Sequence, residues 1–169
     1  MHIAYVMAEG RGETDLLLYD LARAARARGL SLAGTVQVNS NCGDDRPCDM
    51  DVEVLPDGPV IRISQSLGPG AKGCRLDPSQ LELAVAAAEA RLAAGCDLVI
   101  VNKFGKHEAE GRGFRGLIGE ALARDVPVLV GVNRLNIPHF LDFIGAGADL
   151  RQPVLPDLLE WLDGVHSPA

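Results

Sequence analysis

The loop at residues 9–14 has the composition of an anion-binding turn. A short apolar run leads directly into Gly10, Arg11 and Gly12, and helical periodicity begins at Thr14. In such a strand–loop–helix turn, unpaired backbone N–H groups and the positive end of the helix dipole attract anions. We therefore predict an anion nest of backbone amides from Gly10 to Thr14, with the Arg11 guanidinium adding charge. A tight turn without a ligand is the alternative interpretation of the same glycines.

Glu13 limits what this loop can bind. A working phosphate-binding loop of the G-x-x-x-x-G-K-[ST] type has a lysine before its Ser or Thr, and no stretch of this chain matches that pattern. The only lysines are Lys72, Lys103 and Lys106, and Glu13 stands just before Thr14. A carboxylate at that position repels phosphates, so the sequence argues against a standard ATP loop.

Positive charge is concentrated in the segment that follows the apolar strand at residues 97–101. Its basic and titratable side chains are Lys103, Lys106, His107, Arg112 and Arg115. In open parallel sheets, ligands bind beyond the carboxyl ends of the strands, where the loops converge. We therefore expect this segment to share one anion site with the loop at 9–14, with Asn39 and Asn102 orienting the ligand. Alternatively, Glu13 pairs with Lys103 and the arginines point to solvent.

Three of the four cysteines flank polar loops. Cys42, Cys48 and Cys74 form no C-x-x-C pair, which argues against a structural zinc site, and a reducing cytoplasm disfavours a disulfide. They stay candidates for a redox or soft-metal role, with the metal undefined. Arg46 and Arg75 lie beside them in the sequence and would bring further positive charge to a bound anion.

Apolar patterning predicts the elements that position these residues. Continuous apolar runs predict strands at residues 2–8, 31–38, 97–101 and 126–132, and the turn Pro56-Asp-Gly58 predicts a hairpin of strands at 52–55 and 60–63. Helices are predicted at 14–28, 77–94, 114–123, 137–144 and 155–162, the last broken near Pro156, and a polar loop at 39–51. Apolar strands that alternate with helices form a mostly parallel sheet covered on both faces. We predict one three-layer α/β domain over residues 1–169, with the hairpin at one edge.

Composition excludes several classes of protein. The chain has 16 basic and 23 acidic residues, a formal charge of −7, which argues against a general nucleic-acid binder. No apolar run reaches the roughly 20 residues that a membrane helix needs. We expect a cytoplasmic protein whose partner is a small anionic ligand, without nucleic acid or membrane insertion. Self-association into a homo-oligomer stays open.

The segment after residue 101 resembles the small nucleoside-triphosphatases of the P-loop class. Their equivalent strand ends in Asp-Glu, followed by a hydrophobic residue, Gly-Lys and a later Glu, and this chain has Gly105, Lys106 and Glu108 at the matching positions. Asn102 replaces the metal-associated Asp, and Lys103 replaces the Glu that would activate water. The resemblance implies a degenerate P-loop nucleotide-binding architecture, and the departures imply that efficient hydrolysis of nucleoside triphosphates is lost, so we expect no efficient enzyme.

Four segments resemble a bacterial domain family of unknown function that is related to those enzymes and often encoded beside molybdate-transport genes. They are Gln37-Val-Asn39, Cys48-Asp-Met50, Gly73-Cys-Arg-Leu-Asp77 and Asn102-Lys-Phe-Gly-Lys106. The resemblance covers about the first 133 residues and continues more weakly to Trp161. It implies a small oxyanion, molybdate or tungstate, as the bound ligand in molybdenum homeostasis.

Two other functions stay open at this point. The chain could bind a nucleotide with Mg²⁺, or hydrolyse it slowly, as the P-loop resemblance implies. It could instead be a regulatory or interaction module in metal homeostasis, with a surface that includes residues 153–165.

Overall fold

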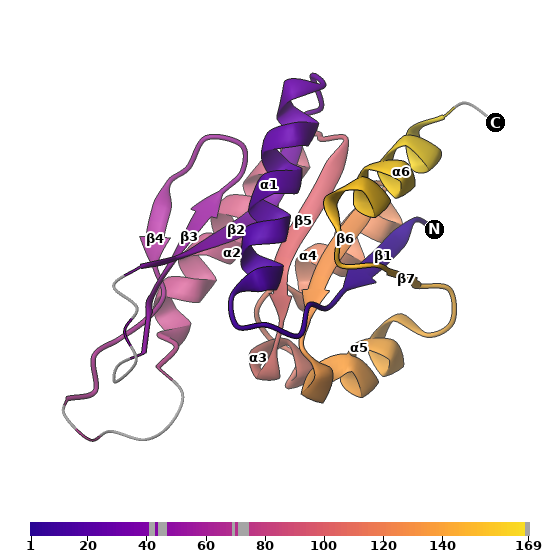
Figure 1. Cartoon of the computed structure of the whole chain (residues 1–169). Coiled ribbons are helices and arrows are strands. Elements are labelled where there is room, and N and C mark those ends of the chain that lie inside the picture. Colours follow the sequence, from indigo (N-terminus) through magenta and orange to yellow (C-terminus); the bar gives the residue numbers. More distant parts are fainter. Residues whose placement is uncertain (41–42, 44–46, 69, 71–74, 168–169) are drawn as a thin grey trace.

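A seven-stranded sheet forms the middle layer of the computed structural model, which describes residues 1–40, 43, 47–68, 70 and 75–167 (Figure 1). The strands are β1 (Ile3–Val6), β2 (Leu32–Ser40), β3 (Asp49–Val54), β4 (Val60–Arg62), β5 (Leu98–Phe104), β6 (Val128–Val132) and β7 (Asp149–Arg151). The helices are α1 (Glu13–Ala27), α2 (Pro78–Ala94), α3 (Lys106–Ala109), α4 (Arg115–Ala123), α5 (Ile137–Ile144) and α6 (Leu155–His166), with a 3₁₀ turn at Arg134–Asn136.

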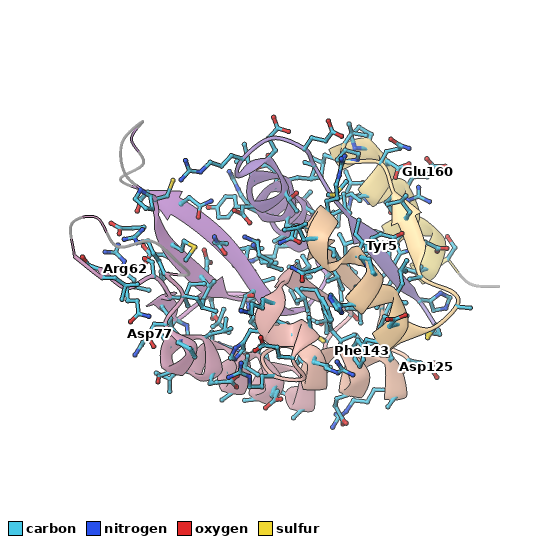
Figure 2. All side chains as sticks on the ribbon, turned by 90° about the horizontal axis from the view of Figure 1, so that it is seen from below. Tyr5, Arg62, Asp77, Asp125, Phe143 and Glu160 are labelled. Carbon is cyan, nitrogen blue, oxygen red and sulfur yellow. The ribbon has the colours of Figure 1, made fainter. Side chains whose placement is uncertain are left out.

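The sheet is mostly parallel, as predicted. Its order is β4-β3-β2-β5-β6-β1-β7. The pairs β2–β5, β5–β6, β6–β1 and β1–β7 are parallel, whereas β2–β3 and β3–β4 are antiparallel. The predicted hairpin therefore lies at one edge, with β4 outermost. In the view from below, Arg62 lies at the hairpin end of the molecule and Glu160 at the opposite end (Figure 2).

Helices cover both faces of the sheet, which confirms the predicted three-layer α/β architecture. On one face, α1 and α6 pack through Leu18, Leu21 and Trp161 against the aliphatic side chains of the strands. On the other face, α2, α4 and α5 pack through residues such as Leu92 and Phe140. Burial of these apolar side chains is the main force that stabilises the fold. No helix in the described part of the chain combines the length and apolar character needed to cross a membrane.

Some elements differ from the predicted ones for local reasons. Residues 39–51 are not a loop throughout, because β2 continues to Ser40 and pairs with β3 at Asn39↔Met50. Helix α6 runs unbroken because Pro156 lies in its first turn, where a backbone N–H has no helical partner to lose. Helix α2 begins as predicted, with Pro78 in its first turn and the Asp77 side chain accepting the backbone N–H of Ser79.

Candidate functional site

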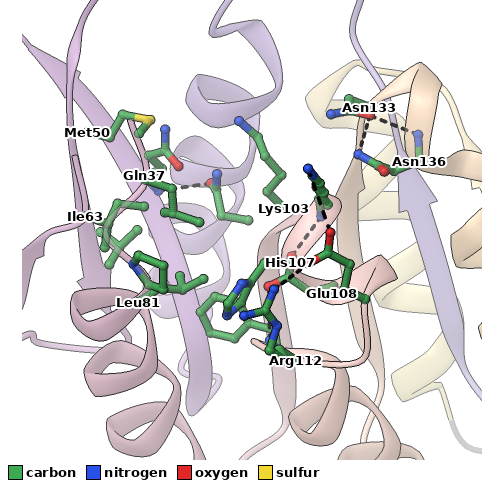
Figure 3. A pocket seen from close by; sticks show the side chains of 18 of the residues that line it. Gln37, Met50, Ile63, Leu81, Lys103, His107, Glu108, Arg112, Asn133 and Asn136 are labelled. Atoms are coloured by element: carbon green, nitrogen blue, oxygen red, sulfur yellow. Dashed lines mark hydrogen bonds and ion pairs between the residues drawn. The ribbon is translucent and has the colours of Figure 1, made fainter. Parts of the chain in front are cut away.

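Two cavities open at the edge of the sheet where the parallel strands end. The first, of about 590 Å³, is the charged cavity, lined by Arg11, Gly12, Asp15, Gln37, Asn39, Gly43, Pro47, Cys48, Met50, Arg75 and Lys103. The second, of about 740 Å³, is the apolar cavity (Figure 3). Its main side chains are Thr35, Val52, Ile63, Leu76, Leu81, Phe114, His107, Glu108, Arg112, Asn133, Asn136 and His139. Gln37, Met50 and Lys103 line both cavities.

The charged cavity draws one cation from each of three segments. Arg11 comes from the loop after β1, Lys103 from the end of β5 and Arg75 from the segment before α2. The Arg75 guanidinium donates to the Cys48 carbonyl oxygen at 3.0 Å, and Arg11 Nη2 lies 3.5 Å from Cys48 Sγ. These contacts hold both guanidinium groups beside the cavity, where their remaining N–H groups can bind an anion.

A buried carboxylate, Asp15, stands at the base of this cavity in the first turn of α1. Asn102 Nδ2 donates to one of its oxygens and Asn39 Nδ2 to the other, each at 2.7 Å. The Gln37 backbone N–H donates to Asn102 Oδ1 at 3.0 Å, and Gln37 Nε2 donates to Asn39 Oδ1 at 2.8 Å. Asp15 is 7% exposed and Asn102 2%. The network joins α1, β2 and β5, and amide hydrogens compensate the buried negative charge.

Asp15 was not predicted from the sequence as a site residue. In the sequence it is one acidic residue at the start of a helix, a position that the helix dipole favours for any carboxylate. A signal was available in the prediction that this helix start faces Asn39 and Asn102, because two amide donors need an acceptor between them.

The loop after β1 is closed by its own side chains. Glu13 Oε2 accepts the Gly10 backbone N–H at 3.2 Å, and Thr14 Oγ1 accepts the Ala8 backbone N–H at 2.9 Å. A Cβ atom on Gly10 would overlap the Glu13 carboxylate. Of the predicted loop residues, Arg11 and Gly12 line the charged cavity, whereas Gly10, Glu13 and Thr14 do not.

The predicted cationic segment is divided between the two cavities. Lys103 reaches the charged cavity, while Lys106, His107 and Arg112 line only the apolar one. Lys106 Nζ lies 3.8 Å from Glu110 Oε1, and Arg112 also pairs with Glu110. The Arg115 guanidinium lies 4.4 Å above the centre of the Phe143 ring. The structure therefore brings Lys103, and not the other predicted cations, to the loop after β1.

Two carboxylates shape the chain from Gly105 to Phe114 into a wall of the apolar cavity. Glu108, 3% exposed, accepts the backbone N–H groups of Gly105 at 2.9 Å and Phe114 at 3.2 Å. Glu82 from α2 accepts the Gly113 backbone N–H at 3.1 Å, and its Oε1 lies 3.0 Å from His107 Nε2. Burial raises the pKa of Glu108 above its ordinary value of 4.5.

The raised pKa of Glu108 predicts a pH-dependent contribution to stability. Because the folded chain holds this proton more tightly than the unfolded chain, the contribution is complete below pH 4.5 and is lost as pH rises through the raised value. Glu108→Gln should flatten this part of the pH dependence, as measured by urea denaturation at a series of pH values. Glu160→Gln, an exposed change on α6, is the control. The same decline with pH in Glu108→Gln and in the unaltered protein would contradict the assignment.

The cysteines among the described residues form no metal centre. No group of three or more His, Cys, Asp or Glu side chains in the described ranges is placed to hold a metal ion. Cys48 is disulfide-bonded, contrary to the expectation from a reducing compartment, so its sulfur is not free to act as a thiolate ligand in this state. Cys42 and Cys74, like Arg46 and Lys72, lie outside the described residues.

Two solved structures have a similar arrangement of helices and strands. The solution structure of a human cancer-related nucleoside triphosphatase superposes with a TM-score of 0.67 at 15% identity, covering 99% of this chain and 100% of that one. The crystal structure of THEP1 from the hyperthermophile Aquifex aeolicus gives 0.65 at 16% identity, covering 98% and 96%. At this level of identity the likeness concerns the fold, and it confirms the predicted P-loop-NTPase-like architecture.

Comparison of sequences finds a relative with higher identity than these two structures, and it also identifies the family of this chain. The chain is 34% identical over 143 residues to the molybdenum import ATP-binding protein ModC 2 of Bradyrhizobium diazoefficiens. That match covers 85% of this chain but only 16% of the relative, so the chain corresponds to one part of a much longer protein. Residues 3–161 match a family described as "Protein of unknown function (DUF2478)". The chain therefore belongs to the DUF2478 family.

Proposed function

We propose that the charged cavity binds a small tetrahedral oxyanion, molybdate or tungstate, and that the protein serves molybdenum homeostasis in the cytoplasm without efficient hydrolysis of nucleoside triphosphates. The observation that carries the proposal is the convergence of Arg11, Arg75 and Lys103, from three separate segments, on one polar cavity. Guanidinium groups present paired N–H donors that match the oxygens of an oxyanion, and Lys103 adds a mobile point charge.

The surroundings of these three basic side chains favour an anion over a cation as the ligand of the charged cavity. Asp15 is the one carboxylate that lines the charged cavity among the described residues, and both its oxygens already accept amide hydrogens. The Asn39 side-chain nitrogen uses one hydrogen on Asp15, which leaves its second N–H as a neutral donor. Among the described lining residues, the guanidinium, ammonium and amide N–H groups therefore face the cavity beside a single carboxylate that is already hydrogen-bonded.

The same residues do not fit a magnesium–triphosphate complex. Phosphoryl transfer needs a phosphate-binding cation on the loop, a metal held by oxygen ligands and an oriented water. Glu13 stands at the loop lysine position and binds the Gly10 amide, which a phosphate would need. Asn102 offers a neutral amide, already bound on both sides, in place of a metal-associated carboxylate. We therefore derive no hydrolytic step from this site.

The choice of anion is supported by the relative in Bradyrhizobium. Its name connects it with molybdenum import, and the similarity to it extends over 85% of this chain. Molybdate is a doubly charged tetrahedral oxyanion, so two guanidinium groups and one ammonium group complement it in charge and in donor geometry.

Isothermal titration tests the proposal with molybdate, tungstate, sulfate and phosphate. We expect molybdate to bind, and Lys103→Met and Arg75→Gln each to weaken that binding by about tenfold or more, since a charge-assisted hydrogen bond contributes roughly 1.5–3 kcal/mol. Arg28→Gln is the matched control, because Arg28 pairs with Asp163 on α6. Absence of heat with every anion, or equal affinity in the two cavity variants and the control, would refute the proposal.

Nucleotide binding is the second candidate, and the shared fold favours it. The apolar cavity, of about 740 Å³, also has the volume of a site for a nucleoside-sized ligand. Mg²⁺-dependent release of phosphate from ATP that disappears in Lys106→Ala would favour this function over oxyanion binding. A zero rate in the unaltered protein would leave the oxyanion proposal as the better account.

A further inference from the structure

One residue, Cys48, contacts two of the three basic side chains of the charged cavity. Its carbonyl oxygen accepts a hydrogen bond from the Arg75 guanidinium at 3.0 Å, and its Sγ lies 3.5 Å from Arg11 Nη2. Cys48 is half-buried and itself lines the cavity. A change in the charge of this sulfur therefore changes the electrostatic potential at the proposed anion site.

The sheet, and not only the sulfur, sets the position of Cys48. This residue immediately precedes β3, whose first residue, Asp49, pairs with Ser40 at the end of β2. The hydrogen bond from Arg75 goes to the main chain of Cys48, so it does not depend on the chemical state of the sulfur. We therefore expect the Cys48 sulfur to stay beside Arg11 whether it is oxidised or reduced.

The sulfur of Cys48 is in its oxidised state in this structure, because it belongs to a disulfide, whereas Cys96 is a free thiol. In the cytoplasm, the compartment of the proposed function, disulfides are usually transient and are catalytic or redox-sensing. A partly exposed sulfur beside a guanidinium group is also in the surroundings that favour a thiolate once the disulfide is reduced. The surroundings of Cys48 are therefore those of a reversible disulfide.

From these contacts we infer that Cys48 is a redox switch of the charged cavity, in which the disulfide permits anion binding and its reduction weakens that binding. A dithiol supplies two electrons and two protons and becomes a disulfide, while the S–S bond breaks and Cys48 and its partner cysteine become thiols. The Cys48 thiol then gives its proton to solvent, and the thiolate pairs with the Arg11 guanidinium, which is no longer available to an anion. The inference rests on the proposed anion site and adds its regulation.

Isothermal titration with molybdate compares the two redox states. Protein reduced with a phosphine, freed of it by gel filtration and kept under nitrogen is titrated beside oxidised protein, and a thiol count verifies each state. We expect reduction to weaken molybdate binding about tenfold, since Arg11 changes from an available donor to a paired one. Cys48→Ser should bind molybdate equally before and after the treatment, whereas Cys96→Ser, which removes the free thiol, should keep the tenfold response.

Two results of this titration would overturn the inference and leave the anion proposal standing. One is equal affinity for molybdate in the oxidised and reduced unaltered protein. The other is a response of Cys48→Ser to the reductant as large as that of the unaltered protein.

Alkylation of the reduced protein tests the pairing of sulfur and guanidinium without any anion. Iodoacetamide reacts with the thiolate, and peptide mass spectrometry follows the reaction at Cys48. Arg11→Gln should slow it about threefold or more, because the thiolate loses its neighbouring cation. Arg28→Gln, which changes a guanidinium paired with Asp163 on α6, is the control. An equal rate in Arg11→Gln and the control would overturn the inference. If neither redox state binds molybdate, the anion proposal fails, and the switch has no ligand to control.

Discussion

Gly34→Ala should leave the chain largely unfolded, with a loss of at least about 4 kcal/mol from the free energy of unfolding. Gly34 lies in β2 opposite Ile100 of β5, and its φ of 98° lies in a region that residues with a side chain rarely adopt. A Cβ atom there would overlap the Ile100 carbonyl oxygen and lie 2.8 Å from the carbonyl carbon. Because β2 and β5 are interior strands, the strain could be relieved only by separating them.

Soluble yield and guanidinium denaturation of Gly34→Ala measure this effect. Gly164→Ala is the matched control, because Gly164 lies within α6 and a Cβ atom there meets open space. The control should gain up to about 1 kcal/mol from the better helix propensity of alanine. A Gly34→Ala protein as stable as the control would show that β2 and β5 do not pair as closely as described.

Asn102→Asp should be the most destabilising polar change at the site, by roughly 3–5 kcal/mol at neutral pH. The substitution restores the carboxylate type found in the resembled triphosphatases, but it places that carboxylate at the position from which Asn102 Nδ2 now donates to Asp15 over 2.7 Å. Two buried carboxylates at that distance repel each other, and the pKa of one of them must rise. The metal-associated carboxylate therefore cannot be restored by this single change.

The pH dependence of Asn102→Asp distinguishes charge repulsion from simple misfolding. The raised pKa belongs to the folded state, so stability is present at low pH and is lost as pH rises through that value. Urea denaturation should show the difference from the unaltered protein shrinking toward about pH 4. Asn133→Asp, in which the new carboxylate can still accept the Asn136 N–H, is the control. If the free energy of unfolding of Asn102→Asp were lower than that of the unaltered protein by the same amount at every pH, charge repulsion would not be the cause.

The fold could be predicted because its strands are apolar throughout and its helices begin and end at recognisable residues. Helix α5 has the predicted bounds of Ile137–Ile144, and β5 begins within one residue of its predicted start. The elements that were not predicted, β7 and α3, have 3 and 4 residues, too few to establish a period. Leu150 in β7 is exposed, so that strand also lacks the apolar run that marks the others.

The candidate site was less predictable because its contacts are either distant in sequence or very local. The position of Asp15 depends on Asn102, which lies 87 residues away, and no spacing rule reports such a pair. Conversely, Arg112 pairs with Glu110 two residues before it, so a count of cations overstates the charge available to a ligand. Arg75 and Lys103 line one cavity although they lie 28 residues apart and belong to different segments, which no local pattern reveals.

The two outermost strands bear on how copies of this protein can associate. Both β4 and β7 have three residues, and in β4 the exposed Arg62 side chain is held by the carboxylates of Asp49 and Asp51. Short, charged margins of this kind resist the lateral addition of a strand from a second molecule, the route by which sheets polymerise. At cellular concentrations, therefore, neither margin should act as a template for ordered aggregates.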